Sequence, residues 1–272
     1  MAALTTAIII IVIISLKNPF TPPSPPKIPF APVRDFYVIY YGQLVDQHGR
    51  MTPQASQIIA AKPSLVIVPF SFSDGRTNLT PEVYQQFKSA GIKVLSYTWT
   101  SYGKRSLNDV KSDIDRQMAA GVDGIFVDEV TNIETDLEFN YYSSIYNYIK
   151  NHDQNKLVVM NPGHYKVSER IMRISDIVSL EEEWIYQEQI PWKINYAPGR
   201  FMGVSSNEYC NQCISESNAA NKTSDAWNNG IGYHYATDKY IDLPNWFSSY
   251  VSQVKEEEKD MSGAATKVTI FT

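Results

Sequence analysis

The chain has 272 residues, of which 43% are hydrophobic and 19% charged, and its formal net charge at pH 7 is −5. This apolar content excludes intrinsic disorder. The length allows a sizeable core, either in two small domains or in one α/β barrel of about 250 residues. The acidic balance argues against a basic protein that follows nucleic-acid phosphates, so we expect no nucleic-acid partner. Two cysteines are too few for a disulfide framework.

Two segments precede the main body. Residues 1–17 hold an almost unbroken apolar run, Ala2–Leu16, which is shorter than the roughly 20 residues that span a bilayer. It is typical of an export signal or an uncleaved anchor that associates residues 1–16 with a membrane; the alternative is a buried core element. Prolines are concentrated in residues 18–33, and this predicts an extended, semi-rigid linker. We therefore expect an extracellular or cell-surface protein. The basic residues after the apolar run would leave the main domain cytoplasmic if the segment is an uncleaved anchor, so cleavage and orientation stay open.

Residues 34–260 alternate between short apolar runs and helical patterns. Most runs are continuously apolar, as in parallel strands covered by helices. Helix starts are indicated by Thr52-Pro53, Thr80-Pro81, Ser106 and Leu243-Pro244. Eight strand–helix units predict an α/β fold, a closed (β/α)8 TIM barrel, whereas a doubly wound open sheet lacks its GxGxxG turn. The expected strands are residues 36–41, 64–70, 93–99, 124–130, 156–163, 176–182, 200–206 and 230–238. Residues 261–272 are expected to be a C-terminal tail that adds an edge strand or stays loose.

Carboxylates end two of the predicted strands. In this fold, chemistry gathers where strands end, and there the sequence has Asp128 and Glu129 after the fourth strand and Glu181 after the sixth. Carboxylates are costly in a core unless they face an open cleft. Adjacent strand residues point to opposite sides, so only one of Asp128 and Glu129 can face the barrel axis unless the backbone bends. Glu182 and Glu183 are better explained as acids in the first turn of a helix.

Aromatic and polar residues also lie near the predicted strand ends. Aromatic rings can bind sugars by stacking without using charge, and glycoside hydrolysis needs one acid to protonate the leaving oxygen and a second carboxylate as nucleophile or base. The pattern therefore favours a glycosidase with a polysaccharide substrate. The residues predicted to bind substrate are Tyr40, Tyr97, Trp99, Asn161 and Tyr233.

Other chemistries have little support. The chain has four histidines but no HExxH, and it has no GxSxG nucleophile motif. Cys210 and Cys213 form a lone CxxC, which is either a short-loop disulfide or half of a metal site. We expect neither a metal nor a cofactor. Asn78-Leu-Thr and Asn221-Lys-Thr are glycosylation sequons that matter only in an exported chain.

Several stretches, in order, resemble the spherulation-specific family 4 (spherulin 4) proteins over roughly residues 35–255. The resemblance implies a TIM-barrel glycoside hydrolase related to enzymes that cut α-1,4-linked galactosamine or N-acetylgalactosamine polymers, with Asp128, Glu129 and Glu181 as the catalytic acids. After the seventh strand the chain reads GVSSNEYCNQC, where the family often shows a His-Asp-like stretch, and this leaves the substrate preference open. The stretches that carry the resemblance are YTWTSYGKRSLNDVKSDID (97–115), GVDGIFVDEV (121–130), the YY…YNYI helix (141–149), NPG (161–163), DIVSLEE (176–182) and the closing GIGYHYATD…LPNWF.

The residues suggest a division of roles. Repulsion within its acidic run favours the protonated form of Glu181, which we predict to be the proton donor. Asp128 is predicted to be the nucleophile or charge stabiliser, because aspartate is intrinsically the stronger acid, and Glu129 to hold substrate or tune the other two. The resemblance favours an endo-acting, retaining enzyme. The alternative is a non-catalytic carbohydrate-binding or structural cell-surface protein on the same scaffold. The oligomeric state is left open.

Overall fold

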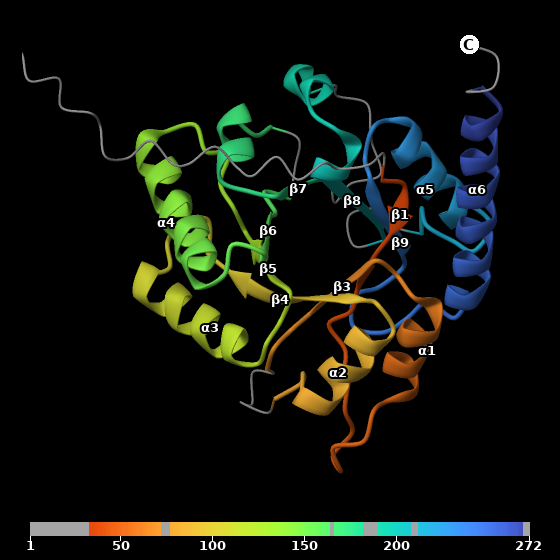
Figure 1. The fold of residues 1–272 in the computed structure, drawn as a ribbon, viewed down its shortest axis with the longest axis horizontal. Helices are drawn as coiled ribbons and strands as arrows, with labels where there is room; N and C mark the ends of the chain where they lie inside the picture. Colours follow the sequence, from red (N-terminus) through yellow and green to blue (C-terminus); the bar gives the residue numbers. More distant parts are fainter. Residues whose placement is uncertain (1–32, 72–76, 164–165, 182–189, 208–211, 269–272) are drawn as a thin grey trace, which may run out of the picture.

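The computed structural model describes residues 33–71, 77–163, 166–181, 190–207 and 212–268. Its strands form one parallel sheet in the order β1-β9-β8-β7-β6-β5-β4-β3-β2. The two outermost strands in this order, β1 (Asp35–Phe36) and β2 (Val38–Ile39), are separated only by Tyr37 and are halves of one strand. β1 pairs with β9 and β2 with β3, so the sheet closes on itself as a barrel (Figure 1).

Each of the eight predicted runs contains an observed strand, with the first run supplying both β1 and β2. All of the ladders are parallel, which confirms the predicted (β/α)8 TIM barrel and excludes the open sheet. The remaining strands are β3 (Leu65–Val68), β4 (Lys93–Trp99), β5 (Gly124–Asp128), β6 (Leu157–Met160), β7 (Ile177–Glu181), β8 (Phe201–Ser206) and β9 (Tyr233–Thr237).

Helices surround the strands on the outside of the barrel (Figure 1). The first three begin where the sequence predicts, because the side chains of Thr52, Thr80 and Ser106 accept hydrogen bonds from backbone N–H groups of the first turn. The fourth begins at a reciprocal capping box between Thr135 and Glu138. The helices are α1 (Pro53–Ala61), α2 (Pro81–Ser89), α3 (Leu107–Ala119), α4 (Asp136–His152), α5 (Ala219–Asn228) and α6 (Phe247–Val268), with 3-10 turns η1 (Glu169–Arg173), η2 (Pro191–Asn195) and η3 (Pro198–Arg200).

The two ends of the chain differ in what the structure describes. The helix α6 runs from Phe247 to Val268 and so crosses the boundary that the sequence placed at residue 260. Residues 1–32, with the predicted signal or anchor and most of the linker, lie outside the described residues. Within the described ranges, no helix is long and apolar enough to cross a membrane.

A buried ion pair anchors α4 at the end of the barrel where the strands begin. The Lys150 ammonium lies 2.6 Å from the Asp176 carboxylate, and both side chains are buried. Asp176 also accepts a bond from the backbone N–H of Val158, and Lys150 donates to the carbonyl of Lys156. All of these charges are therefore compensated within the protein.

We expect Lys150→Met to destabilise the fold by about 3–5 kcal/mol, because it leaves the Asp176 carboxylate buried without its cation. Urea unfolding at neutral pH measures this loss. The matched control is Arg116→Met, which breaks an ion pair to Asp113 in which the arginine is exposed, and it should cost about 1 kcal/mol or less. Equal losses in the two variants would contradict the prediction.

Candidate active site

Asp128, the last residue of β5, and Asn161, which directly follows β6, meet at the carboxyl ends of their strands. The Asn161 side-chain amide donates a hydrogen bond of 2.7 Å to Oδ1 of Asp128. Asn161 is itself buried, and its Oδ1 accepts from the backbone N–H of Gly163. Asp128 is half-buried, and the buried Asn161 amide orients its carboxylate.

The backbone bends directly after Asp128. Glu129 has a φ of 54°, in the left-handed region that a non-glycine residue seldom adopts. Such a conformation costs on the order of 1–3 kcal/mol and is typical of functional sites. The bend ends the strand alternation that would send adjacent side chains to opposite faces. Strand alternation therefore does not force the Asp128 and Glu129 side chains to opposite faces.

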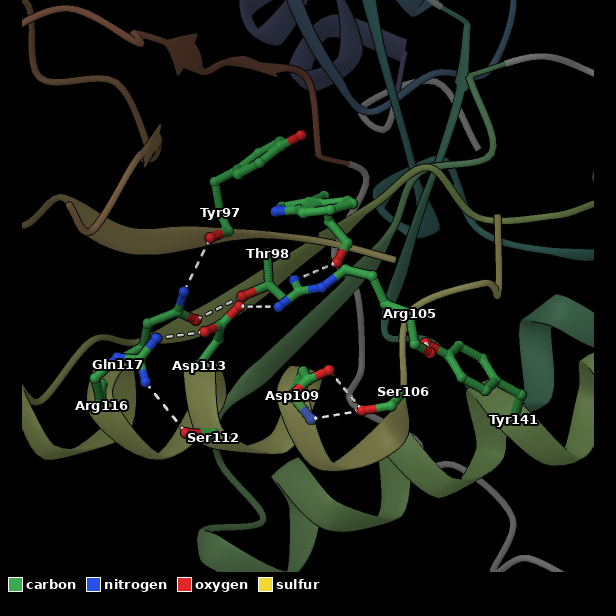
Figure 2. A network of polar contacts seen from close by, with 11 residues as sticks. Tyr97, Thr98, Arg105, Ser106, Asp109, Ser112, Asp113, Arg116, Gln117 and Tyr141 are labelled. Carbon is green, nitrogen blue, oxygen red and sulfur yellow. Dashed lines mark hydrogen bonds and ion pairs between the residues drawn. The ribbon is translucent and has the colours of Figure 1, made fainter. Parts of the chain in front are cut away.

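Trp99 ends β4 beside Asp128 and provides an exposed aromatic ring. The two residues are partners in the β4–β5 register, and 43% of Trp99 is exposed. The guanidinium of Arg105 lies 4.3 Å from the Trp99 ring centroid, and its Nη1 donates to the Trp99 carbonyl. Figure 2 shows Arg105 extending to Asp113 on α3, where the ion pair is 2.7 Å long. The cation and its carboxylate hold the tryptophan in place.

A tyrosine cluster lies farther around the same end of the barrel. The Tyr97 ring stacks on Phe126, with centroids 6.3 Å apart, and meets the Tyr41 ring edge-on at 5.4 Å. Tyr41 in turn contacts Tyr240, which follows β9. Sequence reasoning did not single out Tyr240, although its position shortly after a strand end was an available signal.

Two residues predicted to bind substrate lie elsewhere. Tyr40 is 3% exposed and donates to the Gln43 carbonyl, and burial, with the nearby charge of Asp242, raises the pKa of Tyr40 to about 12. Its ring is buried and therefore offers no face to a sugar. Tyr233 is the first residue of β9, not near its end, so it lies at the opposite end of the barrel from Asp128. Gly230, with a φ of 79°, turns the chain after α5 and makes the strand begin later than predicted.

Glu181 is the last residue of β7, and its backbone pairs with Gly203 of β8 after a register shift at Ser179. Because β5 and β7 are parallel strands of one barrel, their carboxyl ends lie at the same end. The Glu181 side chain, together with Glu182 and Glu183, lies outside the described part of the chain.

Ser205 and His234 form a hydroxyl–imidazole pair that is unsuited to catalysis. His234 contacts Ser205 at 3.2 Å and Thr223 at 2.9 Å, and all three residues are fully buried. Desolvation lowers the pKa of His234 to about 3, so its ring stays neutral. The pair therefore joins β8, β9 and α5 as part of the core.

The remaining sequence motifs fall outside the site. Asn78 is fully buried and bonds to Leu44, Gly42 and Pro69, so the folded chain excludes glycosylation there, whereas Asn221 is exposed on α5. In the described ranges, no group of three or more His, Cys, Asp or Glu side chains could hold a metal ion. Cys213 is disulfide-bonded, which favours the disulfide alternative for the CxxC; Cys210 lies outside the described residues.

The closed parallel barrel is shared with solved structures of other proteins. Sph3 of Aspergillus clavatus, solved in complex with GalNAc, matches with a TM-score of 0.63 and 17% identity over 82% of this chain and 98% of that one. The GH18 chitinase ChiB of Flavobacterium johnsoniae matches with a TM-score of 0.53 and 11% identity over 84% and 95% of the two chains. At these identities the likeness shows the fold alone, which is a closed (β/α)8 barrel.

The chain belongs to spherulation-specific family 4, whose family model matches residues 55–257. This confirms the resemblance found in the sequence. Spherulin-4 of Physarum polycephalum is 34% identical over 96 residues. That alignment covers 35% of this chain and 28% of the relative, so the match extends over less than a third of the relative's length.

Proposed function

We propose that the protein is an exported or surface-anchored, endo-acting glycoside hydrolase whose substrate is a polysaccharide containing galactosamine or N-acetylgalactosamine. The observation that carries this proposal is the pairing at one strand edge of Asp128, oriented by Asn161, with the exposed ring of Trp99. Family membership and the GalNAc complex of Sph3 support the amino-sugar substrate. Residues 1–17 would supply the export signal or anchor and residues 18–33 the spacer.

In the proposed mechanism a sugar ring stacks on Trp99 and brings its glycosidic bond to the carboxylates. Glu181 gives its proton to the leaving oxygen while Asp128 attacks the anomeric carbon and forms a glycosyl-enzyme. Water then releases the sugar, with Glu181 acting as the base. Glu129 binds substrate or tunes the other two acids. A retaining enzyme of this kind holds its two carboxyl groups about 5–5.5 Å apart, against roughly 6.5–9.5 Å for inversion.

The test is to incubate the purified full-length chain with soluble galactosamine-containing polymers of high and low N-acetylation. We expect new reducing ends and, early in the reaction, a ladder of intermediate oligosaccharides, which is the mark of endo cleavage. Proton NMR of the first product should show the anomeric configuration of the substrate. Binding of the polymer without any new reducing ends would favour the non-catalytic carbohydrate-binding alternative.

We expect Trp99→Ala to raise KM by up to about tenfold with a smaller effect on kcat, because ring stacking contributes about 0.5–1.5 kcal/mol. Initial rates on the cleaved polymer measure both constants. The matched control is Trp192→Ala, since Trp192 packs on Phe201 at the amino end of β8 and is far from the proposed cleft. If both variants raise KM equally, Trp99 does not contact substrate.

A further inference from the structure

Two buried hydroxyl groups converge on the backbone of the turn that carries Asp128 and Glu129. Thr100, in the loop after β4, has its Oγ1 2.8 Å from the Glu129 carbonyl and 3.0 Å from the Asp128 carbonyl. The Tyr142 hydroxyl, on α4, accepts from the backbone N–H of Thr131 at 3.0 Å and lies 3.5 Å from the Glu129 carbonyl. The two hydroxyls are 3.3 Å apart, and both residues are fully buried.

The loop that faces this turn is bent in the same way. Ser101 and Tyr102 have φ values of 51° and 53°, and the backbone N–H of Tyr102 donates to the Glu129 carbonyl at 2.8 Å. The carbonyl of Glu129 therefore faces three donors from two other segments. Burial raises the pKa of Tyr142, so its hydroxyl keeps its proton at neutral pH. Contacts of this kind can hold a non-glycine residue in the left-handed region.

We propose that Thr100 and Tyr142 are positioning residues, which hold Glu129 in its left-handed conformation and thereby set the directions of the Asp128 and Glu129 carboxylates. The inference rests on the proposed function, because it assigns the two hydroxyls a part in that reaction. Neither group touches substrate; each acts on main-chain atoms of the carboxylate-bearing turn. Without them the turn can relax toward extended backbone, which changes the directions of the Asp128 and Glu129 side chains.

The barrel offers matched controls for loss of a buried hydroxyl. Thr98 lies on β4 two residues before Thr100 and is 1% exposed, but its hydroxyl bonds to Gln117 of α3 (Figure 2). Tyr146 is a buried tyrosine one turn after Tyr142 on α4 and interacts with Asp176 at the far end of the barrel. Thr98→Val and Tyr146→Phe therefore perturb the core without touching the turn.

We expect Thr100→Val and Tyr142→Phe each to lower kcat about tenfold or more while KM stays within about twofold, because small displacements of reacting groups are costly to the rate. Thr100→Ser keeps the hydroxyl and should retain most of the activity. Thr98→Val and Tyr146→Phe should lower the melting temperature and leave kcat near that of the parent. If kcat falls no further in the Thr100 and Tyr142 variants than in these controls, the proposal is overturned.

Crystal structures of the same variants test the proposal without relying on activity. We expect the φ of Glu129 to leave the left-handed region in Thr100→Val or Tyr142→Phe and to stay positive in the two controls. A turn that keeps its conformation in both Thr100→Val and Tyr142→Phe would overturn the positioning role even if the parent cleaves polymer. If the parent cleaves no polymer, the proposed function is overturned. The crystal structures would still show whether Thr100 and Tyr142 hold Glu129 in its left-handed conformation.

Discussion

Asp128→Asn should lower kcat for polysaccharide cleavage by about a thousandfold or more, in line with the loss of nucleophiles elsewhere. The amide has nearly the shape of the carboxylate and keeps an oxygen that can accept the hydrogen bond from Asn161. The melting temperature should therefore change by no more than a few degrees. Initial rates and thermal unfolding of the same preparation measure both quantities.

The matched control for this variant is Asp123→Asn, just before the amino end of β5. Asp123 accepts hydrogen bonds from the backbone N–H of Val94 and from the Tyr84 hydroxyl, so its carboxylate links the barrel to α2. Asp123→Asn should lower stability and leave kcat near that of the parent. Near-full activity of Asp128→Asn on a polymer that the parent cleaves would remove Asp128 from the mechanism.

The barrel could be predicted because its strands are buried on both faces. Runs such as 64–70 and 124–130 are continuously apolar, and that pattern is a local property of the sequence. Helix starts were equally local, since a threonine followed by proline both caps a helix and fixes its first φ. The start of β9 was missed because a glycine turn, not hydrophobicity, decides where the strand begins, and this placed Tyr233 at the wrong end.

The site was predictable only as far as strand ends determine it. Asp128, Asn161 and Trp99 follow from the rule that parallel strands bring their carboxyl ends to one edge. The bend at Glu129 does not follow from this rule, because the hydroxyls that bond to its carbonyl belong to Thr100 and Tyr142 on other elements. The cation beneath Trp99 is equally non-local. These features depend on which loops pack together, which a single sequence does not state.

The remaining question about the site is which carboxylate gives the proton. Substrates with different leaving groups can answer it. Glu181→Gln should lower kcat for polymer cleavage by about 10²–10⁴-fold, the range that general acid catalysis contributes. A synthetic aryl glycoside with a nitrophenolate leaving group needs little help from an acid. On that substrate, the first step in Glu181→Gln should be much less impaired.

The comparison with Asp128→Asn turns this into an assignment of roles. A nucleophile is needed whatever the leaving group, so Asp128→Asn should disable cleavage of both the polymer and the aryl glycoside. For Glu181→Gln, azide should restore turnover of the aryl glycoside by attacking the glycosyl-enzyme. The alkaline limb of the pH profile of kcat/KM should also disappear in this variant, because that limb reports loss of the acid's proton. If Glu181→Gln disables both substrates and Asp128→Asn spares the aryl glycoside, the two roles are reversed. The strand ends would still define the site, but Glu181 would then be the nucleophile.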